Sequence, residues 1–104
     1  HRTIRDPTMI PSGIHRIEKE DVPALHFPAE PVHWSDEHRR LRDGNIARAT
    51  QLGNLEHTKS RIVFRDNEGL KVVESTVWAF DADNIVLKKG VTIPIARVVE
   101  VDLL

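Results

Sequence analysis

Residues 61 to 88 read RIVFRDNEGLKVVESTVWAFDADNIVLK, and this stretch decides the fold. It holds three runs of β-favouring residues that two polar turns separate, at residues 66 to 69 and 81 to 84. In the first run Ile62 and Phe64 share one face, which is the period of two expected for a strand with one buried side. The stretch therefore predicts a series of antiparallel strands joined by short turns.

The middle run, residues 70 to 80, is long, and its alternation slips at Val72 and Val73. We expect a β-bulge or a sharp bend there, because either one exchanges the two faces of a strand. Two more strands are predicted after it, at residues 92 to 95 and 98 to 103. Five short strands at intervals of about 8 to 12 residues predict a mainly β chain, folded as a strongly bent, antiparallel, five-stranded small barrel.

Pro94 limits the position of the fourth of these strands. Proline has no N–H to donate to a sheet, so this strand is expected at an edge, at a bulge or at its own end. A free edge at Pro94 would be a docking site for a second copy of the chain or for a peptide.

Residues 35 to 53 carry the helical pattern. Ser35 is a good N-cap, and Gly53 followed by Asn54 is a stop signal. The apolar stripe is weak, and Gly44 lowers helix propensity by about 1 kcal/mol relative to Ala, so one short helix or two shorter pieces are both compatible with it. The expected buried face holds Leu41, Asn45, Ala49 and Leu52.

Basic side chains are concentrated in the helix and the first strand. They are either a solvated surface or a patch for nucleic acid or an acidic partner. The members of this candidate patch are Arg39, Arg40, Arg42, Arg48, Lys59, Arg61 and Arg65.

The N-terminal third reads as an extended arm. Residues 1 to 8 precede Met9 and resemble an expression tag with its cloning scar. Residues 9 to 34 hold four of the six prolines, which excludes a long helix. Because this part is too apolar for a free linker, we expect it to lie across the barrel and to bury Phe27 and Trp34.

The composition excludes several classes of protein. The chain has 104 residues, a net charge of -1 and no cysteine, so disulfides and thiolate chemistry are excluded. No apolar run reaches the roughly 18 residues of a spanning helix. We therefore expect a single cytoplasmic domain that does not interact with membranes.

One helix followed by five short strands, the second of them bent, resembles the Sm-like fold and its bacterial Hfq-type branch. The segments that carry the resemblance lie within residues 35 to 104, and the arm is outside it. They are Gly69-Leu70-Lys71-Val72, then Phe80-Asp81 with Ile85-Val86-Leu87-Lys88, and Ile93-Pro94-Ile95-Ala96-Arg97-Val98-Val99-Glu100-Val101. The resemblance implies a small barrel, and in that family such barrels bind RNA.

The positions that contact RNA in this family are not matched. A lysine-histidine pair closes the uridine pocket of Hfq-type proteins, but here the stretch reads Pro94-Ile95-Ala96. Ile85 stands where Sm proteins carry a base-gripping asparagine, and Arg97 is the one candidate remnant of their arginine. The resemblance therefore implies the fold and leaves RNA binding as an alternative.

No catalytic or cofactor motif is found. Ser75 and Thr76 lack a glycine-rich elbow, and no glycine-rich phosphate loop occurs. The histidines near the arm and helix match no established zinc spacing, so we expect no metal, no cofactor and no enzymatic activity. These histidines are His26, His33, His38 and His57.

These features favour a non-enzymatic interaction module that self-associates, as a homo-oligomer, or docks a protein. Trp34, Trp78 and Pro94 are its expected interface residues, because an exposed strand tryptophan and a free edge both mark contacts. In the alternative for these tryptophans, Trp34, Trp78 and Phe80 form one face that the arm or the helix covers. The alternative is an Sm-like regulator that binds RNA or single-stranded nucleic acid through the basic residues between Arg39 and Arg65.

Overall fold

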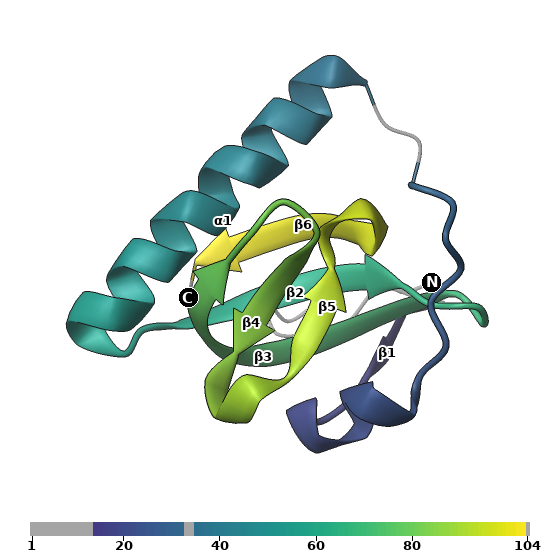
Figure 1. The fold of residues 1–104 in the computed structure, drawn as a ribbon, viewed down its shortest axis with the longest axis horizontal. Coiled ribbons are helices and arrows are strands. Elements are labelled where there is room, and N and C mark those ends of the chain that lie inside the picture. The colour runs from purple at the N-terminus through teal and green to yellow at the C-terminus, as the bar shows by residue number, and fades with distance from the viewer. Residues whose placement is uncertain (1–13, 33–34, 104) are drawn as a thin grey trace, which may run out of the picture.

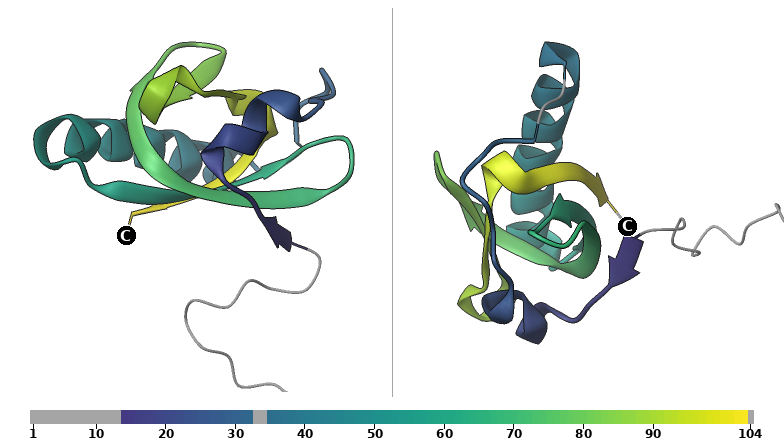
Figure 2. Two further views of the ribbon diagram at one scale, coloured as in Figure 1. Left: turned by 90° about the horizontal axis from the view of Figure 1, so that it is seen from below. Right: turned by 90° about the vertical axis from the view of Figure 1, so that its right-hand side faces the viewer.

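The computed structural model describes residues 14–32 and 35–103, and shows one helix packed on a strongly curved sheet (Figures 1 and 2). Residues 1–13, which include the tag-like residues 1–8, lie outside the described residues, as do His33, Trp34 and Leu104. The elements in chain order are β1 (Ile14–Arg16), η1 (Lys19–Ala24), α1 (Asp36–Glu56), β2 (Lys59–Arg65), β3 (Leu70–Phe80), β4 (Asn84–Leu87), η2 (Lys88–Gly90), β5 (Thr92–Pro94), η3 (Ile95–Arg97) and β6 (Val98–Leu103).

The sheet is centred on β3, and its strand order is β5-β4-β3-β2-β6. β2 pairs with residues 70 to 76 of β3, whereas β4 pairs with residues 77 to 80 along the other edge. β1 joins that second edge in parallel, at residues 70 to 72. The mainly β prediction is confirmed, with two corrections: the sheet has six strands, since the arm supplies one, and among the described strands none joins β5 to β6, so it is open.

The β-bulge predicted at Val72 and Val73 is wrong. The β2–β3 register runs unbroken through both residues, and the irregularity of β3 falls between Val77 and Ala79. Val72 and Val73 are 2% and 0% exposed, so both faces of β3 are covered at this point. Two adjacent valines therefore reflect burial on both sides of a strand rather than a change of register.

α1 is one continuous helix that begins after Ser35, whose side-chain oxygen accepts a hydrogen bond from the His38 N–H at 3.1 Å. Of the two alternatives, the structure has the single helix, with no break near Gly44. Its buried face shares Ala49 with the expected one but otherwise lies one residue further along, at Arg42, Ile46 and Gly53. Leu41, placed on the buried face by the sequence pattern, is 62% exposed.

Gly53 is not the helix stop that the sequence indicated. The helix continues to Glu56 and ends at His57 in the left-handed conformation (φ 56°). A Cβ atom on Gly53 would lie 2.3 Å from the carbonyl oxygen of Val77. The glycine is therefore needed for close packing of α1 on β3, and α1 also packs on β6.

Two buried arginines join the elements around η3. Arg42 donates from Nη1 to the carbonyl oxygens of Ile95 and Val98, at 3.2 and 3.3 Å. Arg97 donates from Nε to the Arg65 carbonyl at 3.0 Å and from Nη1 to the Glu30 carbonyl. A buried guanidinium with its donors used in this way holds backbone segments together.

The described part of the arm crosses the sheet. Val22, in η1, is 1% exposed and belongs to the core. The Phe27 ring lies 5.8 Å from the ring of Phe64, and the Val32 N–H donates to the Ala96 carbonyl at 2.8 Å. Burial of apolar arm residues stabilises a sheet of this size, which has a small core of its own. Among the described residues no helix is long and apolar enough to cross a membrane.

Candidate functional site

The helical members of the predicted basic patch have unlike environments. Arg39, Arg40 and Arg48 are exposed on α1, and Arg39 pairs with Asp36. Arg42 is buried and holds η3 and β6, as described above. The arginine that the sequence placed in the middle of the patch therefore has a structural role.

The strand members are spread along β2. Lys59 is exposed at the start of the strand, and Arg65 is exposed at its end. Arg61 is half-buried, and its Nη2 lies 3.4 Å from Glu74 Oε2. Arg16 of β1 reaches the other oxygen of Glu74 at 3.2 Å, so one carboxylate is shared by two guanidinium groups. That these seven basic residues form one binding patch stays a prediction.

A polar groove of about 370 Å³ lies where β1, η1 and η2 approach β3. We call it the Trp78 groove. It is lined by Arg16, Glu18, Lys19, His57, Lys59, Glu74, Ser75, Thr76, Trp78 and Lys88. It lies beside the part of β3 between its pairings with β1 and β4.

Cations outnumber carboxylates in this groove, four to two. Arg16 is paired with Glu74, and Lys19 lies 3.0 Å from Glu20. Among the described residues, Lys59 and Lys88 have no acidic partner, and both are exposed. The groove therefore presents two unneutralised ammonium groups to solvent.

Trp78 is 43% exposed within this basic surrounding. Its backbone is held from the helix side, because Asn54 Nδ2 donates to the Trp78 carbonyl at 3.1 Å. The neighbouring end of α1 is tied to β3 by Thr76, whose hydroxyl donates to the His57 carbonyl at 3.4 Å. An indole presented in this way offers a stacking face beside positive charge.

Of the predicted basic patch, only Lys59 lines the groove. Arg16, Lys19 and Lys88 were missed, because their approach depends on the parallel pairing of β1 with β3 and on the η2 turn. The sequence signal that does point here is Trp78, an aromatic side chain on the outward register of its strand.

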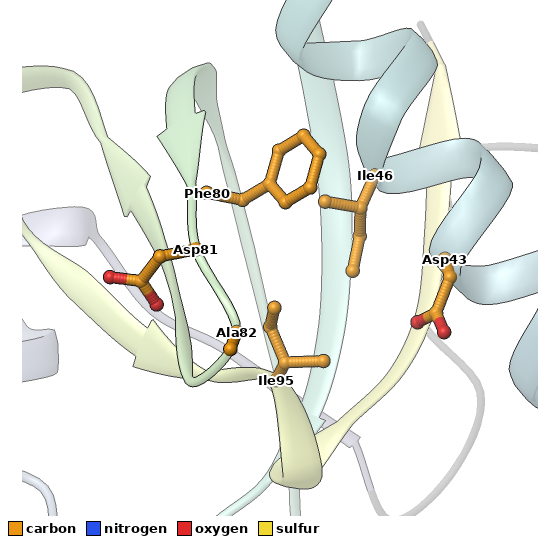
Figure 3. A pocket seen from close by; sticks show the side chains of 6 residues that line it. All are labelled: Asp43, Ile46, Phe80, Asp81, Ala82 and Ile95. Carbon is orange, nitrogen blue, oxygen red and sulfur yellow. The ribbon is translucent and has the colours of Figure 1, made fainter.

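A second, apolar pocket of about 230 Å³ opens between α1 and the β3–β4 turn (Figure 3). We call it the Phe80 pocket, and its lining residues are Asp43, Ile46, Phe80, Asp81, Ala82 and Ile95. Figure 3 shows the Phe80 ring facing Ile46, with Ile95 below them. Phe80 is 45% exposed although it faces this pocket, so part of an aromatic ring is open to solvent.

The rim of the Phe80 pocket is acidic. In Figure 3 Asp43 and Asp81 lie on opposite sides of the facing Phe80 and Ile46 side chains, and the Asp81 carboxylate points away from the Phe80 ring. Arg42 Nε donates to Asp43 Oδ1 at 3.0 Å. Asp81 Oδ1 accepts the N–H groups of Asn84 and Asp83, both at 2.8 Å, and these bonds hold the pKa of Asp81 below its ordinary value. The Asp81 carboxylate is therefore charged at neutral pH.

Pro94 lies in β5, the last strand at one end of the sheet order, where it pairs with Asn84 of β4. This is the edge position that its missing N–H predicts. Trp34, the third expected interface residue, lies outside the described residues.

Within residues 14–32 and 35–103, no three His, Asp or Glu side chains gather in a way that could hold a metal ion. Comparisons with family models, with curated proteins and with solved structures found no match for this chain.

Proposed function

We propose that this protein is a non-enzymatic binding module whose Trp78 groove takes single-stranded nucleic acid, RNA being the first candidate. The observation that carries the proposal is the exposed indole of Trp78 among Arg16, Lys19, Lys59 and Lys88. Proteins that bind single strands combine an aromatic platform for a base with cations that follow the phosphates.

The proposal also includes an Sm-like unit for residues 35 to 104. Its support is the element order, one helix and then the antiparallel strands β2 to β6, with β3 paired to different partners along its two halves. The nucleic-acid site proposed here does not use the family's unmatched positions. It uses the groove that the arm helps to build, and it therefore needs its own test.

The test measures binding of a fluorescently labelled 12-nucleotide oligouridine by anisotropy at low salt. Trp78→Ala is expected to weaken binding by about 5-fold to 150-fold, since stacking of one base is worth about 1–3 kcal/mol. The matched control is Phe80→Ala, which removes a ring of similar exposure on the same strand but outside the groove. Equal loss in both variants, or no binding by the wild type, would contradict the proposal.

Salt dependence gives a second, independent reading of the same site. Lys59→Gln and Lys88→Gln each remove a cation without an acidic partner among the described residues. Each is expected to reduce the slope of log affinity against log salt by about 0.7, the value for one phosphate contact on a single strand. Arg65→Gln, on the same strand as Lys59 but outside the groove, is the control and should leave the slope unchanged.

The open sheet favours self-association as a second candidate function. Among the described strands, β5 and β6 each pair on one side only, so each presents an edge at which a second copy can add. Mass measured by light scattering should then rise with protein concentration. A constant monomer mass up to millimolar concentration would contradict this candidate.

A further inference from the structure

We propose that the Phe80 pocket is a docking site for a short polypeptide segment of a partner protein, in which one large apolar side chain is flanked by Arg or Lys. The proposal does not rest on the nucleic-acid site, because the two surfaces share no lining residue.

The size and polarity of the pocket define the apolar part of its occupant. Its volume of about 230 Å³ is below the roughly 300–1,000 Å³ that drug-sized ligands fill, and suits a single side chain. Ile46, Phe80 and Ile95 face one another across it, so a Leu-sized group entering there leaves water on every side. Burial of the exposed part of the Phe80 ring contributes most to the binding free energy.

The rim defines the charge of the flanking residues. Asp43 lies on α1 at one side of the opening, and Asp81 lies on the β3–β4 side with its carboxylate turned away from the Phe80 ring. A cation beside the apolar anchor therefore meets Asp81 across the turn, outside the pocket itself. Asp83, in the same turn as Asp81, is exposed and adds a third carboxylate nearby. An acidic segment would be repelled from this opening.

The turn at Asp66 shows that an aspartate held in this way can bind an ammonium group. The turn before β3 holds Asp66 in the same way as the next turn holds Asp81, and there Lys71 Nζ lies 2.8 Å from Asp66 Oδ2. At Asp81, only Oδ1 is used by the described residues. A partner's cation at Asp81 Oδ2 would therefore take the place that Lys71 takes in the first turn.

The experiment uses three capped tripeptides and the amide and methyl NMR signals of the full chain. Arg-Leu-Arg is expected to shift the signals of Ile46, Ala82 and Ile95. Arg-Ser-Arg removes the anchor and should bind about tenfold more weakly or worse, given the free energy of burying a leucine. Glu-Leu-Glu reverses the charges and should give no saturable shift.

Variants of the protein assign the effect to the pocket. Asp43→Asn with Asp81→Asn should weaken Arg-Leu-Arg by about fivefold, since each exposed ion pair is worth about 0.2–1 kcal/mol. Asn keeps an oxygen acceptor for the turn. If the NMR signals of residues away from the two substitutions match those of the wild type, the fold is retained. Equal binding of Arg-Leu-Arg and Glu-Leu-Glu, shifts confined to the Trp78 groove, or full affinity in the double variant would overturn the proposal.

These outcomes are separable from those of the nucleic-acid test. The double aspartate variant lies outside the Trp78 groove, so it should bind oligouridine at least as well as the wild type. Loss of peptide binding with retained oligouridine binding supports the Phe80 pocket, whereas loss of both would show that the fold has changed.

Discussion

The two turns at the ends of β3 are built from the same hydrogen bonds but serve different purposes. In residues 66 to 69, Asp66 Oδ1 accepts the N–H groups of Glu68 and Gly69, and the Asp66 N–H donates to the Gly69 carbonyl at 3.0 Å. In residues 81 to 84, Asp81 makes the three equivalent bonds with Asp83 and Asn84. An aspartate that accepts from the second and third following residues is a common way to close a turn.

The difference between the turns lies five residues after each aspartate. Lys71 is paired with Phe64 in the first hairpin, and Val86 is paired with Ala79 at the same register of the second. Asp66 is 3% exposed and Lys71 is 7% exposed, so the first turn contains a buried ion pair. The second turn is exposed, and among the described residues the Asp81 carboxylate bonds only to the backbone N–H groups of Asp83 and Asn84. One local pattern therefore stabilises the fold in one place and faces a candidate docking pocket in the other.

The largest effect is expected from breaking the buried pair. Asp66→Asn leaves the buried Lys71 ammonium with only the exposed Glu68 carboxylate, 3.3 Å from its Nζ, as a counter-charge. It should lower the free energy of unfolding by about 3 kcal/mol, the lower end of the cost of breaking a buried ion pair. Asp81→Asn changes an exposed side chain and keeps the oxygen that accepts the turn hydrogen bonds, so the free energy of unfolding should change far less. Urea unfolding of both variants checks this contrast, and similar losses in the two would show that the turns are equivalent.

The pH dependence of stability should also come from the first turn rather than the second. Burial alone would raise the pKa of Asp66, but hydrogen bonds from Lys71 and from the N–H groups of Glu68 and Gly69 outweigh it, so this pKa lies below 3.8. The pKa of Lys71 is raised above 10.5, chiefly by its hydrogen bond to Asp66. The pair therefore contributes its full stability between these two pH values.

Below pH 3.8 the stability from Asp66 is lost as the pH falls through its folded pKa, and above pH 10.5 the stability from Lys71 is lost as the pH rises. Unfolding midpoints measured from pH 2 to 7 should fall steeply in the wild type and in Asp81→Asn. They should fall much less in Asp66→Asn, which has no such carboxyl to protonate. An unchanged acid slope in Asp66→Asn would contradict the assignment.

Local features of the fold and of the candidate site could be predicted from the sequence, whereas long-range features could not. Both turns, the strand at residues 70 to 80 and the N-cap at Ser35 follow from short patterns in the sequence, and the structure has all of them. The pairing of β1 with β3 joins segments more than fifty residues apart, and no local pattern encodes it. Since β1 and η1 form one wall of the Trp78 groove, two of its four cations, Arg16 and Lys19, were missed for the same reason.

The errors in the helix and in the basic patch share a second cause. Arg42 was assigned to the surface because it is charged, and the helix face was assigned from its leucines. In the structure Arg42 is buried, because two backbone carbonyls and Asp43 satisfy its donors, and Gly53 is buried because β3 approaches it closely. A rule that places polar residues outside cannot anticipate partners from η3 and β6.

The smallest and most specific effect is expected from giving the second turn its own lysine. Val86 stands where Lys71 stands in the first hairpin, so Val86→Lys should bring an ammonium group to Asp81 Oδ2. Val86 is half-buried, and we expect the free energy of unfolding to change by about 1 kcal/mol or less, because exposed pairs contribute little. The pKa of Asp81 should fall further, since a cation favours the charged form.

The new lysine should also compete with a partner's cation. If Asp81 attracts the arginine of a docked segment, Val86→Lys should weaken the Arg-Leu-Arg peptide by a factor of about 2 to 5, the value of one rim charge pair. Val86→Gln has a long side chain without the charge and should leave peptide affinity near that of the wild type. Equal weakening by Gln and Lys would mean that bulk at this position matters and the charge of Asp81 does not. The comparison between the turns would then hold for stability but not for binding.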